Sequence, residues 1–208
     1  MRKRTNSPLF LLFLSVLCVL SGGELAQAQE KGTILFVGSS IFHRWTQLTT
    51  QMAPLPITNI AFDGASAEDW NRLIESRVIP AKPKVVAYYC GSNDVDLGDS
   101  ASQIAGRIRF FIDKVTTALP DTRIVFVSVN RAPEKQDRWG VVDDINRQIR
   151  QLAAKNPRVI YVDVNPVLAN ADGSARSELF MNDRLHLRPP AYEEFARILK
   201  PVLTEALR

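Results

Sequence analysis

The sequence predicts one domain of the α/β class, a three-layer α/β/α sandwich around a parallel sheet of five strands. Two observations support this prediction. Five short apolar runs are nearly continuous rather than alternating with polar residues, as in strands buried on both faces. Segments with helical spacing of apolar residues lie between them, and such alternation is typical of a parallel sheet covered by helices on both sides.

The five runs are rich in β-branched and other apolar residues, which favours strands of four to eight residues. The expected strands are residues 33–37, 57–62, 85–89, 123–129 and 159–164.

The helices are expected between these strands. Residues 66–78 open with Ser66, a good capping residue, and the two acidic residues that follow suit a helix N-terminus. Residues 101–119 and 143–155 carry isoleucine and leucine at helical spacing. A last helix is expected to begin at Pro189-Pro190, because proline fits the first turn.

The first 28 residues have the three parts of a secretory signal peptide. Three basic residues follow Met1, an apolar run covers residues 9–20, and Ala26-Gln27-Ala28 forms a cleavage site. The run is shorter than the roughly 20 residues of a bilayer span, so we expect no stable membrane span after cleavage. The mature domain is then residues 29–208, secreted or periplasmic.

Two alternatives for the leader stay open. In the first, the leader stays uncleaved and anchors the protein in the membrane. In the second, the chain is a lipoprotein with a lipid on Cys18; Leu17 argues against this, because lipoprotein signals need a small residue before the cysteine.

Charge and cysteine content exclude several classes of protein. Cleavage of the leader removes three basic residues and one acidic residue, so the net charge falls from +4 to +2. This charge predicts no nucleic-acid partner. Cys90 alone remains and allows no internal disulfide. With two histidines and one cysteine, no metal or other cofactor is predicted. The sequence predicts no particular oligomeric state.

Polar residues with catalytic potential follow the first three strands. These segments are Gly38-Ser39-Ser40, Asp63-Gly64-Ala65 and Gly91-Ser92-Asn93-Asp94. Ligands of open parallel sheets bind at the carboxyl ends of the strands, where these segments meet. Taken singly, each segment also suits an ordinary turn.

A base for a serine hydroxyl is found near the C-terminus. His186 follows the long irregular stretch 165–182, and Asp183 precedes it by three residues, close enough to hold its Nδ1. The other nitrogen would then take a proton from a serine. The alternative for such a pair is a helix cap or a surface contact. His43, the second histidine, fits a helix surface near the site.

Four segments in order resemble the SGNH hydrolases, also called GDSL-type esterases: Leu35–Ser40, Asn59–Gly64, Gly91–Asp94 and Asp183–Leu187. The resemblance covers the whole mature chain. It is strongest with small bacterial GDSL-like lipase/acylhydrolases related to platelet-activating factor acetylhydrolase subunits. It implies a flavodoxin-like five-stranded sheet and an ester hydrolase.

The resemblance also implies roles for individual residues. Ser40 would be the nucleophile, His186 the general base and Asp183 the residue that orients the imidazole. The backbone N–H groups of Ser40 and Gly64 and the side-chain amide of Asn93 would form the oxyanion hole. Asp94 would support the neighbouring loop.

The sequence departs from the family pattern at several positions. The usual Gly-Asp-Ser reads Gly38-Ser39-Ser40, and Arg184 replaces a glycine between the triad Asp and His. Arg188 and Ala191 replace the usual Asn and Gly before Tyr192. Substrate preference is therefore open, since Arg184 would reach an anionic substrate. Arg131, after the fourth strand, would either touch a substrate or lie in solvent.

Four other residues have two interpretations each. Trp45, Trp70 and Trp139 suit core or rim packing, and Trp45 or Trp139 would alternatively be a sugar platform. Cys90 suits a small buried position rather than a second nucleophile.

The predicted function is hydrolysis of a small-molecule or glycan ester, with a short acyl group such as acetyl, because no long insertion is present to form a lid. A lipase, lysophospholipase or thioesterase would use the same triad. A noncatalytic binding module on the same fold is the alternative from another class, although such a module needs no catalytic residues.

Overall fold

The computed structural model describes residues 33–208. The signal peptide predicted for residues 1–28 lies outside this part of the chain. No helix within residues 33–208 is long and apolar enough to cross a membrane.

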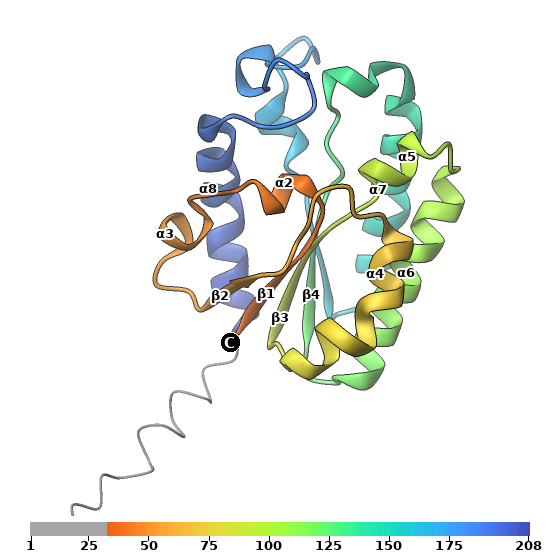
Figure 1. The fold of residues 1–208 in the computed structure, drawn as a ribbon, viewed down its shortest axis with the longest axis vertical. Helices are drawn as coiled ribbons and strands as arrows, with labels where there is room; N and C mark the ends of the chain where they lie inside the picture. The colour runs from red at the N-terminus through yellow and green to blue at the C-terminus, as the bar shows by residue number, and fades with distance from the viewer. Residues whose placement is uncertain (1–32) are drawn as a thin grey trace, which may run out of the picture. The chain divides into compact units, whose positions relative to one another are not determined.

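Five parallel strands form one sheet, as the sequence predicts (Figure 1). Their order is β2-β1-β3-β4-β5, the flavodoxin-like arrangement, so the strand order reverses between β1 and β3. The strands are β1 (Ile34–Gly38), β2 (Ile57–Asn59), β3 (Val85–Tyr89), β4 (Arg123–Val127) and β5 (Val159–Val162).

Helices cover both faces of this sheet (Figure 1). One layer contains α2 (Ser40–His43), α3 (Leu48–Met52) and α8 (Pro189–Ala206). The other contains α4 (Ala67–Leu73), α5 (Ser92–Asp96), α6 (Ala101–Ala118) and α7 (Trp139–Ala153). Short helical turns complete the chain: η1 (Ile74–Val78), η2 (Ile79–Ala81), η3 (Pro133–Arg138), η4 (Asn165–Leu168) and η5 (Ser177–Leu179).

Alternate side chains of the central strands build two separate cores. Ile34 and Phe36 of β1 pack in the cluster beneath α8, whereas Leu35 and Val37 pack in the cluster beneath α4, α6 and α7. Successive side chains of a strand point to opposite faces, so a strand with a layer on each side must be apolar throughout. This explains the continuous apolar runs in the sequence.

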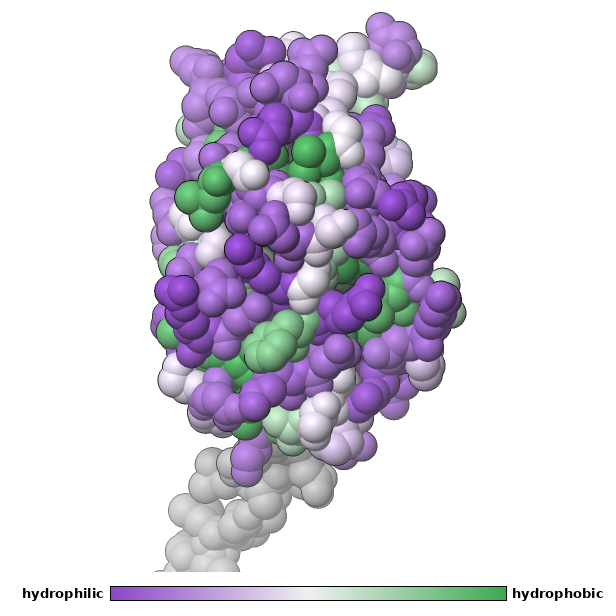
Figure 2. Space-filling model, turned by 90° about the vertical axis from the view of Figure 1, so that its right-hand side faces the viewer, coloured by the Kyte–Doolittle hydropathy of each residue, from purple (hydrophilic) through white to green (hydrophobic). Residues whose placement is uncertain are grey.

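The outer surface of the second helical layer is mostly hydrophilic, with small scattered apolar areas (Figure 2). This is the pattern of amphipathic helices that bury one face only.

Several expected boundaries shift. The regular strand expected at 57–62 covers only Ile57–Asn59, although the N–H groups of Ile60 and Phe62 still donate to β1, to the carbonyls of Phe36 (3.0 Å) and Gly38 (3.2 Å). The helix expected at 66–78 is α4 followed by the π-helical turn η1, and its Ser66 forms the expected cap as part of a capping box with Asp69.

Two further differences concern helices. The helix expected at 143–155 begins four residues earlier, at Trp139. The short helix α2 contains His43, which was expected on a helix surface, whereas the five-residue helices α3 and α5 were not expected from the sequence.

Candidate active site

Ser40 lies at the carboxyl end of β1, as the first residue of the short helix α2. The turn is possible because Gly38 packs directly on β3, where a Cβ would lie 2.3 Å from the Tyr89 carbonyl oxygen. The Gly38 carbonyl also accepts the indole N–H of buried Trp70 at 3.0 Å. These contacts hold the segment before Ser40 against both β3 and α4.

The loop before α8 brings two more side chains to Ser40. His186 Nε2 lies 2.9 Å from the Ser40 hydroxyl oxygen, and His186 Nδ1 lies 2.6 Å from an oxygen of Asp183. The second Asp183 oxygen accepts the backbone N–H groups of Leu185 and His186, each at 3.0 Å. The structure thus brings together the three residues expected from the sequence, in one hydrogen-bonded line.

The Asp183 carboxyl is ionised over the neutral and mildly acidic range. Partial burial raises its pKa, but the hydrogen bonds from the His186 ring and from two backbone N–H groups outweigh burial and bring the pKa to about 2. A carboxylate on Nδ1 favours the imidazole tautomer in which Nε2 faces the hydroxyl as an acceptor.

The other expected groups come from the two neighbouring strand ends. Gly64 has φ +76°, a left-handed conformation that favours glycine, and a Cβ there would meet nothing within 4 Å. Its backbone angle therefore explains the glycine at this position. Neither the Ser40 nor the Gly64 N–H donates a hydrogen bond within residues 33–208. Asn93 donates one amide N–H to the Ala65 carbonyl (2.9 Å), which leaves its second N–H for a ligand.

Asp94 is fully buried and anchors this edge of the site. Its carboxylate accepts the Ala67 N–H at 3.0 and 3.1 Å and contacts Arg107 at 3.4 Å. Burial raises its pKa, which these partners only partly oppose. It ties α5, the helix of Asn93, to α4 and α6, in agreement with the support predicted for it.

The two arginines singled out in the sequence differ in their partners. Arg131 is exposed and makes a bidentate ion pair with Asp143 at 2.6 and 2.7 Å, and it lies over the Trp139 ring at 5.7 Å. Arg184 has φ +60° and donates from Nη2 to the Pro133 carbonyl at 3.3 Å. The left-handed φ explains why glycine is usual at this position.

The remaining singled-out residues are mostly structural. Trp45 is 2% exposed and stacks on Tyr192 (ring centroids 5.2 Å apart), so the sugar-platform interpretation of Trp45 is wrong. Trp139 is partly exposed. His43 is exposed, with Nδ1 2.9 Å from the Ala61 carbonyl. Cys90 is buried as expected, and burial raises the pKa of its thiol, which favours the unreactive neutral form.

One ion pair at the site was not expected from the sequence. Arg44, one turn after Ser40, binds Asp63, the residue before Gly64, through Nη2 at 2.8 Å. It links the nucleophile helix to the Gly64 loop. The only sequence signal was the presence of opposite charges just after two strand ends.

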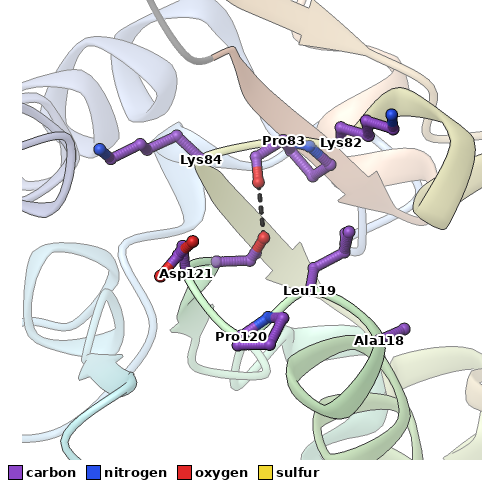
Figure 3. Close-up of a pocket in the computed structure, with 8 residues that line it drawn as sticks. Lys82, Pro83, Lys84, Ala118, Leu119, Pro120 and Asp121 are labelled. Carbon is purple, nitrogen blue, oxygen red and sulfur yellow. Dashed lines mark hydrogen bonds between the residues drawn. The ribbon is translucent and has the colours of Figure 1, made fainter.

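A cavity of about 250 Å³ lies at the other end of the sheet, between residues 82–84 and 118–122 (Figure 3). The Thr122 hydroxyl donates to the Pro83 carbonyl at 2.6 Å across it. This cavity flanks the amino ends of β3 and β4, whereas ligands of such sheets bind at the carboxyl ends. Among residues 33–208 no cluster of three or more potential metal ligands occurs.

Comparison with known proteins agrees with this architecture. The sequence model of the GDSL-like lipase/acylhydrolase family matches residues 32–194. No curated protein matches the chain in sequence.

Among solved structures, the chain is similar to a GDSL-like lipase from Bacteroides thetaiotaomicron (15% identity, TM-score 0.70, 86% of this chain and 90% of that one). It is similar to a carbohydrate esterase family 3 protein from Talaromyces cellulolyticus (17%, TM-score 0.68, 85% and 98%). It is also similar to a variant of an acetyl-xylooligosaccharide esterase from Geobacillus stearmophilus (16%, TM-score 0.63, 85% and 94%). At these identities the likeness establishes the fold.

Proposed function

Since this chain belongs to the GDSL-like lipase/acylhydrolase family and is an ester hydrolase, we propose that it is a serine esterase acting through an acyl-enzyme on Ser40. Its substrate is an ester of a short acyl group, such as an O-acetyl group on a carbohydrate. The observation that carries the proposal is the hydrogen-bonded line from Ser40 through His186 to Asp183.

The reaction follows from this geometry. Ser40 Oγ attacks the ester carbonyl carbon while His186 Nε2 takes the hydroxyl proton, and Asp183 stabilises the imidazolium. The C–O bond to the alcohol then breaks, and the imidazolium returns the proton to the departing oxygen. Water attacks the acyl-enzyme in the same manner, which releases the acid and restores the Ser40 hydroxyl.

The negative oxygen formed during both steps needs donors. The free N–H groups of Ser40 and Gly64 and the second amide N–H of Asn93 come from three adjacent strand ends, and we assign the oxyanion hole to them. Donors held by the fold act without reorganisation at the moment of reaction, which makes them effective.

Two observations support a short acyl group on a carbohydrate. Two of the similar structures are a carbohydrate esterase and an acetyl-xylooligosaccharide esterase. The longest connection at this edge of the sheet, residues 163–188, folds on itself through the bridges Ala169–Ala175 and Phe180–Leu187 and carries Asp183 and His186. It is therefore not free to form a lipid-covering lid.

Activity of purified variants tests the triad. Ser40→Ala and His186→Ala should each lower turnover of p-nitrophenyl acetate on the order of 10⁴–10⁶-fold, with the double variant scarcely worse, because the pair acts as a unit. A fluorophosphonate should label Ser40 in the wild type. The Ser39→Ala variant should be labelled to the same extent as the wild type. Full activity of Ser40→Ala would exclude the triad, and a preference for long p-nitrophenyl esters would favour a lipase.

We also propose that the protein is exported, on the strength of the charged, apolar and Ala26-Gln27-Ala28 segments of the leader. Expressed in a bacterium, the processed protein should begin near Gln29. N-terminal sequencing that finds residues 1–28 on the exported protein would contradict cleavage.

A further inference from the structure

A cavity of about 240 Å³ lies beside the loop of Asp183 and His186, between η3 and residues 174–184. It combines apolar walls, hydroxyl groups and one cation. We call it the Trp139–Arg184 cavity; its lining includes Pro133, Trp139, Ser174, Ser177, Phe180 and Arg184.

Arg184 brings an unneutralised charge to this cavity. Its guanidinium makes one hydrogen bond, to the Pro133 carbonyl, and no carboxylate lies within 4.0 Å of it in residues 33–208. By contrast, Arg44, Arg131 and Arg176 at the same edge of the sheet each have a carboxylate partner. Arg184 is therefore the cation of this cavity that is available to an anion.

The backbone conformation at Arg184 is unfavourable for an arginine. With φ at +60°, the position favours glycine, and a residue with a Cβ is less stable there. Local backbone preference therefore does not explain the arginine. The Glu134 N–H donates to the Arg184 carbonyl (3.1 Å) and fixes this conformation against η3.

Trp139 supplies an aromatic surface to the same cavity. Its indole N–H is already bound to the Ala132 carbonyl at 2.8 Å, and Arg131 lies over its ring at 5.7 Å, so the part of the ring that stays exposed, rather than the N–H, is offered to a ligand. The Ser177 hydroxyl adds a group that both donates and accepts, whereas the Ser174 hydroxyl already donates to Asp172 (2.6 Å) and accepts from the Asn170 amide (3.0 Å). An aromatic ring, a hydroxyl and a guanidinium together suit a sugar ring that bears a carboxylate.

We propose that the Trp139–Arg184 cavity binds a carboxylate-bearing sugar unit of an acetylated glycan, so that acidic glycan esters are preferred over neutral ones. This inference rests on the proposed esterase function, whose base His186 follows the cavity residue Arg184 by two positions in the chain. The cavity is smaller than the roughly 300–1,000 Å³ of pockets for drug-sized ligands, so it accommodates one unit of the glycan.

The test compares three substrates: p-nitrophenyl acetate, an acetylated neutral xylo-oligosaccharide, and the same oligosaccharide with a uronic acid side group. Arg184→Gln and Arg184→Gly should lower the acidic-to-neutral ratio of kcat/KM about tenfold, mainly through KM, because a charge-assisted contact is lost. Because Arg184 lies between Asp183 and His186 in the chain, each variant's rates are divided by its own rate on p-nitrophenyl acetate, which corrects for any change at the triad. Arg77→Gln, an equal charge change on exposed η1, should leave the ratio unchanged.

An unchanged ratio in both Arg184 variants would overturn the proposal, as would an equal fall in Arg77→Gln, which would indicate net charge alone. If the wild type hydrolyses none of the three substrates, the esterase proposal fails instead. Calorimetric titration of Ser40→Ala with the acidic and neutral oligosaccharides then tests the cavity without turnover. Equal affinity for the two would refute it.

Discussion

Gly38→Ala would insert a methyl group between the end of β1 and the main chain of β3. The added Cβ would lie 2.3 Å from the Tyr89 carbonyl oxygen and 3.2 Å from its carbon. A backbone group cannot rotate away, so β1 must shift, and overpacking of this kind destabilises by about 1–3 kcal/mol. We expect a destabilisation at the upper end of this range. It is partly offset by the ~0.5–1 kcal/mol by which Gly→Ala stabilises a protein through its effect on the unfolded chain.

The net loss of about 2 kcal/mol should lower Tm by roughly 4–8 °C for a domain of this size. Urea unfolding and calorimetry measure it. Activity per folded molecule should fall as well, because Ser40 follows two residues later. Gly106→Ala in α6 is the matched control: its Cβ would meet nothing within 4 Å, and it should stabilise by about 0.5–1 kcal/mol. A Gly38→Ala variant as stable as the wild type would refute the close-packing argument.

Two further predictions concern the site. Asn93→Ala should keep the wild-type Tm within a few degrees yet lose about 10²–10³-fold in kcat, as for other amide donors of oxyanion holes; unchanged kcat on p-nitrophenyl acetate would reject the assignment. The Asp183 pKa of about 2, lowered from 3.8, means that its stabilising effect is complete above pH 3.8 and is lost as pH falls towards 2. Urea midpoints of wild type and Asp183→Asn should therefore converge as the pH falls from about 4 to 2; a difference independent of pH over this range would contradict this carboxylate's role.

The sheet was predictable because both of its faces are buried. A strand between two helical layers has no polar alternation, and this pattern located β1, β3, β4 and β5 to within two residues at each end. β2, an edge strand with exposed Thr58 and Asn59, was overestimated in length. The regular strand stops at Asn59, whose side chain bonds to Phe42 and Ala61, while Ile60 and Phe62 still donate single backbone bonds to β1. Such contacts leave no periodic signal.

The site was predictable in its residues but not in its local environment. Short motifs at strand ends indicated Ser40 and Asn93, since parallel strands place their carboxyl ends together, and the Asp183-x-x-His186 pair before the last helix indicated the base. The partners of Arg131 and the exposure of Trp45 depend on packing between segments that are distant in sequence. The helices α2 and α5 have only four or five residues and so carry no measurable periodicity.

The contact between Ser40 and His186 joins residues 146 positions apart in the sequence. Neither side chain is reactive on its own: an isolated serine hydroxyl is a weak nucleophile. Under the proposed mechanism, hydrolytic activity therefore arises only when the first strand and the last helix are both in place, and a growing or partly folded chain carries no esterase activity.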